Sequence, residues 1–497
     1  MDLLYDIDKC INEADNIFDL IANCFDLLCS HITNHALFIG QYIDQSQDST
    51  TNPNIENLNY FSEKIIKILD NYSPSKYADV QKEIIQLINN FDLIDFMDDQ
   101  KNHDTIIYCI LCAIDAAAME WDRKWLTSSF GPLNKKPNAR YKVYFHTHRT
   151  IHSDYIDQIG RTRTHPSTFF EQFQSFRFID SGRWKENINI PYIKYLPGNY
   201  IKKKPADILN PDLKLKIAVI PVSCNKNFDF ELITGSTFRV DYSKNDQTAA
   251  AETIIKSIEK ALLAECNIIV LPEYTISPII HKAIQETIRK HSLKNCNGNT
   301  LFAVFEGSTW TDDDNNVMRI LDPFGDEIGR YYKYSPYTKL NTTKHGFNYV
   351  EGLTTPGKQC DMLALEDLGL FLPAICRDVI DGEYTAEIAK ALFPTFIVIS
   401  AWSASVASFK SKEKEFANKY FTSSIFANSC SSVDINQDTI CNGCIVSKEN
   451  TIAGSYVCNL DRSNCTATCN ADPCAFIMEY DFTFESDCNT CIASQKI

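Results

Sequence analysis

Three short strings in the second half of the chain each carry a reactive side chain at or just past the end of a run of apolar residues. They are LPEYT at Leu271–Thr275, YYKYSP at Tyr331–Pro336 and AICRDV at Ala374–Val379. The apolar runs have the length and composition of strands, so we expect Glu273, Lys333 and Cys376 at strand ends. A base, a cation and a thiol delivered in this way can together attack and open a carbon–nitrogen bond.

Each string also has an ordinary structural explanation. A glutamate after Leu-Pro is usually a solvated turn residue, a lysine beside tyrosines is usually a surface charge with a buried stem, and a lone cysteine after a strand is usually a small buried hydrophobe. A pseudoenzyme, which keeps the fold of an active enzyme but no longer catalyses its reaction, is a further alternative. A Cys–His hydrolase is another, but His281, His291 and His345 have no recognisable catalytic context.

In this order, with about 40–60 residues between them, the three strings resemble the nitrilase, or carbon–nitrogen hydrolase, superfamily. The resemblance covers residues 214–484. It includes a hairpin with Pro323 and Gly325, where the family has a D-P-x-G turn, and Glu351 followed by Pro356–Gly357, where the family has an E…PG segment. The resemblance implies an α/β fold, an αββα sandwich of the nitrilase type. We expect a mostly α-helical region before it.

Strand-like and helix-like segments alternate through this region, which favours layered α/β structure. Strands are predicted at Leu215–Val222, Asn267–Leu271, Leu301–Phe305, Val317–Asp322, Leu368–Ile375, Phe396–Ser400 and Ala475–Phe484. Helices are predicted around Ala249–Ala264 and at Glu383–Leu392, and Trp402 follows one of the strands.

The resemblance implies a thiol hydrolase that cleaves a non-peptide carbon–nitrogen bond, in a linear amide or a related small molecule, without a cofactor or metal. Glu273 would act as the base, Cys376 would form a thioester, and Lys333 with the backbone N–H of Arg377 would stabilise the oxyanion. Glu351 would be a second glutamate that orients the lysine and the attacking water. Acyl transfer to an amine would use the same residues, so it remains an alternative.

The run Cys376-Arg377-Asp378 departs from the family, which often has Cys-Tyr-Asp or Cys-Trp-Glu at this point. The departure leaves the fold prediction intact and favours the amidase-type branches over the nitrile-hydrolysing branch.

A chain of 497 residues predicts two or three domains. We expect a helical acidic region at 1–130, a basic, aromatic-rich connecting region at 131–213 and the hydrolase domain at 214–497. The acidic N-terminus lacks the basic start of a secretory signal, and the apolar stretch Thr105–Met119 contains Asp115 and predicts a core helix rather than a membrane span. A cytoplasmic protein without a membrane segment is therefore expected.

Charge divides the first part of the chain into two. Residues 1–100 carry 18 acidic and 5 basic side chains, whereas residues 135–204 carry 14 basic and 5 acidic ones, within a chain of net charge −16. The basic segment has interleaved aromatic residues and could bind nucleic acid, or it could dock on the chain's own acidic helices. A second functional hypothesis follows, in which this region senses a nucleic acid, nucleotide or protein partner and regulates a nitrilase-like effector, as in bacterial defence proteins.

Nine of the 19 cysteines follow residue 429, and they include the CxxC pairs Cys441/Cys444 and Cys488/Cys491. Scattered reduced thiols are the expected state of a cytosolic chain, and a structural zinc site is the alternative. The histidines His146, His148 and His152 could hold a metal, but no carboxylate or thiol motif joins them. The resemblance also implies a homo-oligomer, at least a dimer.

Overall fold

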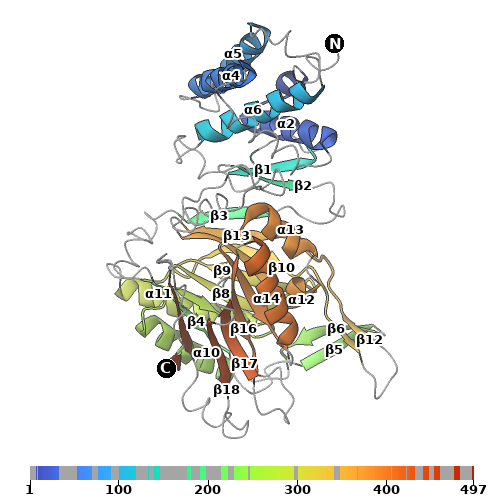
Figure 1. Ribbon diagram of the computed structural model, residues 1–497. Helices are drawn as coiled ribbons and strands as arrows, with labels where there is room; N and C mark the ends of the chain where they lie inside the picture. Colours follow the sequence, from blue (N-terminus) through green and yellow to red (C-terminus); the bar gives the residue numbers. More distant parts are fainter. Residues whose placement is uncertain are drawn as a thin grey trace. The chain divides into compact units, whose positions relative to one another are not determined.

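The computed structural model divides the chain into two compact units, Met1–Thr147 with Ile156–Lys185, and His148–Tyr155 with Glu186–Ile497 (Figure 1). The structure describes residues 7, 9–32, 53–69, 77–90, 100–118, 133, 139–145, 176–180, 191–196, 214–221, 229–234, 236–243, 247–295, 300–340, 348–365, 368–381, 383–403, 406–420, 422–430, 440–446, 453–458, 475–481 and 495–496. The predicted domain boundaries at 130 and 213 stay predictions.

The first unit is built mainly from helices. Its elements are α2 (Ile17–His31), α4 (Pro53–Leu69), α5 (Tyr77–Asn90), α6 (Gln100–Ala118), β1 (Tyr141–Phe145) and β2 (Phe176–Asp180). Asn16 begins α2 as its N-cap, because its side chain accepts the N–H groups of Phe18 and Asp19. The antiparallel β1–β2 pair packs on this helix, where the Phe25 ring stacks on Phe178 at 3.7 Å between centroids.

Two seven-stranded sheets form the centre of the second unit. The first sheet has the order β10-β9-β8-β7-β4-β19-β20, and the second has the order β18-β17-β16-β15-β14-β13-β3. The strands of the first sheet are β4 (Lys214–Val219), β7 (Ile268–Val270), β8 (Ala303–Trp310), β9 (Asn316–Leu321), β10 (Glu327–Tyr332), β19 (Phe476–Asp481) and β20 (Gln495–Lys496). The strands of the second are β3 (Tyr192–Leu196), β13 (Asp361–Leu365), β14 (Gly369–Ile375), β15 (Phe396–Ala401), β16 (Ser423–Asn428), β17 (Ile440–Val446) and β18 (Ala453–Cys458).

Helices cover the outer face of each sheet (Figure 1). Isoleucines of α10 (Gln247–Leu263) and α11 (Pro278–Lys294) pack in one apolar cluster with side chains of β4, β7 and β8. The second sheet carries α12 (Arg377–Ile380), α13 (Glu383–Leu392) and α14 (Ala407–Tyr420). The inner faces meet where Phe396 of β15 packs edge-on against Tyr480 of β19, with centroids 4.8 Å apart. Helix, sheet, sheet and helix are thus stacked in four layers, and the predicted αββα sandwich is confirmed.

A smaller sheet lies beside the sandwich and was not anticipated from the sequence. Its strands are β5 (Asp229–Thr234), β6 (Thr237–Asp241), β11 (Thr338–Leu340) and β12 (Asn348–Glu351), in the order β11-β12-β6-β5. β6 runs parallel to β12 and places Phe238 opposite Glu351. The N–H groups of Val350 and Gly352 donate to the carbonyls of Ser236, which precedes β6, and Phe238 of β6, at 2.8 and 2.9 Å. This sheet therefore fixes the backbone on both sides of Glu351.

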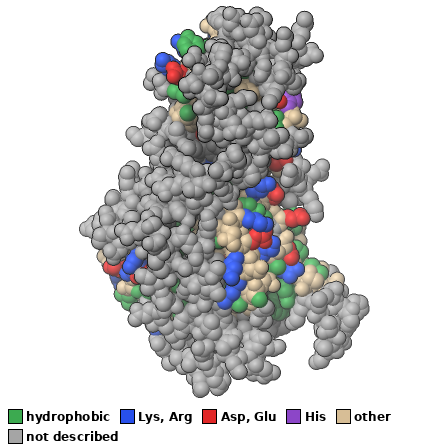
Figure 2. All heavy atoms as spheres, viewed as in Figure 1, with side chains coloured by type: hydrophobic (Ala, Val, Ile, Leu, Met, Phe, Trp, Pro, Cys, Tyr) green, Lys and Arg blue, Asp and Glu red, His purple; other side chains and the backbone are tan. Residues whose placement is uncertain are grey.

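The surface view shows acidic and basic side chains interspersed over the described part of the second unit (Figure 2). Ion pairs such as Lys412–Glu415 and Lys419–Glu415 lie on α14. No helix in the described part of the chain is long and apolar enough to cross a membrane. Most of the basic segment 135–204, with His146, His148 and His152, lies outside the described residues, so its binding partner stays a prediction.

Candidate active site

Glu273 follows β7, a fully buried strand that lies between the parallel strands β4 and β8. Gly307 of β8 packs against the Leu271–Pro272 backbone at a φ of +59°, and a Cβ at this position would collide with the Pro272 carbonyl. Only glycine accepts both the positive φ and this close approach without strain. The turn that carries Glu273 is therefore fixed by its neighbouring strand, and the Glu273 side chain is 1% exposed.

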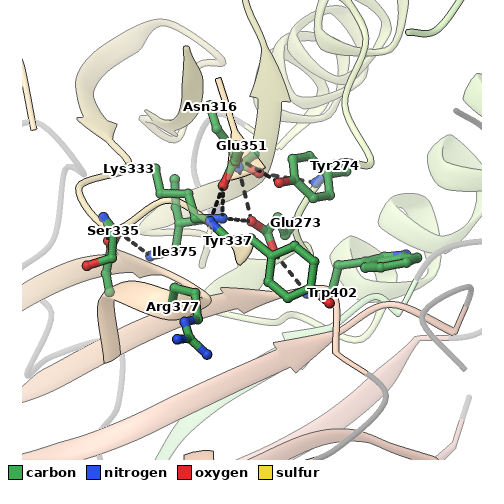
Figure 3. Close-up of polar contacts among 12 residues, drawn as sticks. Glu273, Tyr274, Asn316, Lys333, Ser335, Tyr337, Glu351, Ile375, Arg377 and Trp402 are labelled. Atoms are coloured by element: carbon green, nitrogen blue, oxygen red, sulfur yellow. Dashed lines mark hydrogen bonds and ion pairs between the residues drawn. The ribbon is translucent and has the colours of Figure 1, made fainter. Parts of the chain in front are cut away.

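Lys333 follows β10, and its backbone N–H donates to the Asn316 carbonyl of β9 at 2.9 Å. Its ammonium Nζ lies 2.6 Å from Oε1 of Glu273 and 2.7 Å from Oε2 of Glu351, and the lysine side chain is fully buried (Figure 3). A buried charge requires compensation of this kind, because water cannot solvate it.

Glu351 ends β12 and is held by four donors. Oε1 accepts from the Tyr274 hydroxyl at 2.7 Å and from Nδ2 of Asn316 at 3.0 Å. Oε2 accepts from the Tyr337 N–H at 2.9 Å and pairs with Lys333. The structure thus places Glu351 beside Lys333.

Asn316 begins β9 and connects the two glutamates. Its Nδ2 donates to Oε1 of Glu273 and to Oε1 of Glu351, at 3.0 Å in each case. One amide and one ammonium therefore bridge two buried carboxylates that would otherwise repel each other.

Cys376 follows β14, which pairs in parallel with β15. Its backbone has a φ of 46° and a ψ of −101°, a conformation that costs a non-glycine residue about 1–3 kcal/mol. The backbone N–H groups of Cys376 and Glu273 donate to the neighbouring carbonyls of Ser400 and Ala401, at 2.9 and 3.4 Å. The N–H of Trp402 donates to Oε2 of Glu273 at 3.1 Å. Glu273 thus contacts the ammonium and lies beside Cys376, and its charge raises the pKa of the thiol.

Burial raises the pKa of Glu273, and the charge of Glu351 raises it further, whereas Lys333 lowers it. Burial and the charge of Glu273 likewise raise the pKa of the Cys376 thiol well above its usual value, against an opposing effect of Lys333. For Lys333, burial acts to lower the pKa, but the two glutamates outweigh it and raise the pKa. The lysine therefore stays charged and the thiol stays protonated at neutral pH.

The sequence did not single out Asn316 or Tyr274 as functional residues. Asn316 directly follows the polar run Asp312–Asn315, yet its side chain is fully buried. The signal that could have identified it is an amide at the first position of a strand, directly opposite the end of β10.

The histidines have other partners. His281 of α11 pairs with the buried Glu306 of β8 at 2.6 Å, and His291 lies 3.3 Å from the Asn295 amide. His345 lies outside the described residues, as do the side chains of Cys441, Cys444, Cys488 and Cys491. Among the residues that the structure describes, no group of three or more potential ligands could hold a metal ion.

Neither a family model nor a curated protein matches the chain. Solved structures do resemble it. An E41Q mutant of an amidase from Nesterenkonia sp. AN1, described with acrylamide added to its active-site cysteine, is 13% identical over 49% of this chain and 89% of its own, with a TM-score of 0.35. Nit3 of Saccharomyces cerevisiae, a member of branch 10 of the nitrilase superfamily, is 15% identical over 52% and 95%, with a TM-score of 0.33.

A glutamine-dependent NAD+ synthetase from Acinetobacter baumannii is 14% identical over 54% of this chain and 46% of its own, with a TM-score of 0.35. The four-layer sandwich is established by this chain's own sheets and helices, and what the chain does must be argued from its own residues.

Proposed function

We propose that the protein is a thiol hydrolase of linear amides or related non-peptide carbon–nitrogen bonds, with Glu273, Lys333, Cys376 and Glu351 as its catalytic residues. One observation carries the proposal. The Glu273 carboxylate contacts the Lys333 ammonium at 2.6 Å, and Glu273 and Cys376 are anchored side by side on the Ala401 and Ser400 carbonyls, in a buried cluster with a strained backbone at Cys376.

In the first half of the reaction, Cys376 attacks the amide carbonyl carbon while its proton passes to Glu273. The carbonyl oxygen becomes an oxyanion, which the Lys333 ammonium and the backbone N–H of Arg377 stabilise. The carbon–nitrogen bond then breaks, and Glu273 donates its proton to the departing nitrogen. An amine leaves, and a thioester remains on Cys376.

In the second half, Glu273 takes a proton from water and the resulting hydroxide adds to the thioester. Collapse of this intermediate releases a carboxylic acid, and Cys376 recovers its proton from Glu273. Glu351 holds Lys333 in place throughout, through the contact of 2.7 Å. If an amine takes the place of water in this half, the product is a new amide and the enzyme is an acyltransferase.

The test is ammonia release from a panel of linear amides, acetamide to hexanamide, by wild type and Cys376→Ala, with thermal melting of both. The proposal predicts that the variant melts like the wild type and releases no ammonia. A Cys376→Ala protein that retains turnover would refute the thiol mechanism. Adding a primary amine to the assay separates hydrolysis from transfer. The dimer and the regulated-effector hypothesis stay predictions.

A further inference from the structure

Asp378, two residues after Cys376, is buried at 1% exposure and accepts four hydrogen bonds. Its Oδ1 accepts the backbone N–H groups of Tyr334 at 3.0 Å and Ser335 at 2.5 Å. Its Oδ2 accepts the Tyr331 hydroxyl at 3.0 Å and the Ile375 N–H at 3.4 Å. Both oxygens thus act only as acceptors.

These donors belong to two segments that are distant in the sequence. Tyr331 and Tyr334 flank Lys333 at the end of β10, whereas Ile375 immediately precedes Cys376 at the end of β14. One carboxylate therefore ties the segment that carries the ammonium to the segment that carries the thiol. Figure 3 shows Ser335 and Ile375 near each other, beside Lys333.

We propose that Asp378 is a positioning residue that, in its ionised form, holds Lys333 and Cys376 in register, so that its protonation disables the site. The inference rests on the proposed function for its turnover readout. Asp378 has no role in the proton transfers described above, because the donors that it contacts are structural.

Protonation would turn one Asp378 oxygen into a donor that faces other donors, so at least one of the four hydrogen bonds would be lost. Burial raises the pKa of Asp378 to about 7, while Lys333, the two backbone N–H groups and the Tyr331 hydroxyl act to lower it. Other titratable groups nearby are Cys360 and Tyr384, which both influence Tyr331, and Glu383, which influences Tyr334. Activity should therefore fall as the pH drops through about 7.

The Tyr331→Phe variant gives the sharpest test, because it removes one hydrogen bond to the charged carboxylate and leaves Lys333 and Cys376 intact. Losing a donor to the ionised form raises a carboxyl pKa. The acid limb of the pH–turnover profile should therefore move to higher pH in this variant. A purely structural role for the tyrosine would lower stability without moving the limb.

Asp378→Asn is the second variant, and Asp361→Asn is its matched control. Asp361 is equally buried, its pKa is also raised by burial, and it accepts hydrogen bonds from the Arg330 N–H at 2.8 Å and the Gln359 amide at 2.6 Å. We expect Asp378→Asn to lower kcat by about 100-fold, as misplacement of catalytic groups does, with KM little changed. The acid limb of the pH–turnover profile near pH 7 should be absent. Asp361→Asn should keep both the limb and the turnover.

Alkylation of Cys376 by iodoacetamide, followed against pH by intact mass and peptide mapping, provides a readout that needs no amide substrate. If the acid limb of the alkylation–pH profile moves to higher pH in Tyr331→Phe, the inference is supported even when no amide is hydrolysed. In that case only the proposed function fails. The inference is overturned if amides are turned over while both Asp378→Asn and Tyr331→Phe retain the wild-type limb. It is also overturned if Asp361→Asn shifts the limb as much as Asp378→Asn does.

Discussion

Two buried cysteines lie 16 positions apart in the second unit and have very different surroundings. Cys360 precedes β13, is fully buried, and has the Tyr384 side chain nearby, which acts to lower the pKa of its thiol. Cys376 follows β14, is 4% exposed, and lies close enough to Glu273 and Lys333 for their charges to shift the pKa of its thiol. Burial raises the pKa of both thiols.

Burial and a raised pKa therefore do not distinguish a reactive thiol from a structural one. The difference lies in the partners, because Cys376 has a base that can take its proton and a buried ammonium that can stabilise the resulting charge. The backbone differs as well, since Cys376 adopts a positive φ and Cys360 does not. Strain of this kind persists only where the surrounding structure enforces it.

The largest expected effect separates these two thiols directly. Cys376→Ser should lower turnover by about 10⁴-fold or more, as loss of a nucleophile does in other hydrolases. Cys360→Ser should leave turnover within about twofold, and should lower the unfolding free energy by about 1–3 kcal/mol because it buries a hydroxyl. Steady-state ammonia release and urea denaturation measure the two effects. Equal losses of turnover would remove the distinction between the two environments.

Lys333→Met tests the contribution of the buried ammonium, which is near Cys376. It leaves two carboxylates buried without their counter-ion, so the unfolding free energy should fall by about 3–5 kcal/mol. Turnover should fall by about 100- to 1000-fold with the loss of oxyanion stabilisation. Adding Glu351→Gln should restore part of the stability and none of the turnover. Restored turnover in the double variant would contradict the role of the lysine.

Asn316→Ala and Asn315→Ala form a matched pair of adjacent buried amides. Asn316 bridges Glu273 and Glu351, whereas Asn315 donates to the Asp313 carbonyl and accepts from Thr355. Each substitution should cost about 1–3 kcal/mol of unfolding free energy, because buried polar groups lose partners. Only Asn316→Ala should also lower turnover, by about tenfold, which corresponds to about 1.4 kcal/mol of barrier. A similar loss of turnover in Asn315→Ala would indicate a general effect of packing.

Tyr274→Phe should have the smallest effect. It removes the hydroxyl that donates to Oε1 of Glu351 at 2.7 Å but leaves the other donors to that carboxylate. We expect a loss of about 0.5–1.5 kcal/mol in stability and a loss of turnover of a few fold. Tyr242→Phe is the control, since the Tyr242 hydroxyl accepts the Trp310 N–H at 3.4 Å whereas that of Tyr274 donates to Glu351. Turnover in that control should match the wild type.

The family resemblance predicted the sandwich, and local signals predicted that Glu273, Lys333 and Cys376 follow strands. The apolar runs fix the strands to within a few residues: Leu368–Ile375 was predicted and β14 is Gly369–Ile375, while the predicted helix Glu383–Leu392 matches α13. Each of the three side chains follows such a run. Glu351 came from the spacing of a family segment. The catalytic roles of all four residues stay proposals.

Asn316 and Asp378 show why the rest could not be predicted. Their importance depends on which donors and acceptors the closed fold brings to them from positions 35–47 residues away. Contacts between residues so far apart leave no periodic pattern in the sequence. The β5–β6 hairpin was not predicted for a related reason, since it is short and part of its apolar surface, including Phe230 and Leu232, is exposed. Its function of bracing Glu351 arises only through pairing with β12.

The most direct measurement of the central claim is intact-mass spectrometry of the acid-quenched enzyme during turnover of a linear amide, followed by peptide mapping. The account predicts a mass increase equal to one acyl group, located on Cys376, absent from Cys376→Ser and unaffected by Cys360→Ser. Hydroxylamine should remove it, as expected of a thioester. An acyl group that maps to Cys360 or to another residue, or turnover with no covalent species on Cys376 at any quench time, would contradict the account.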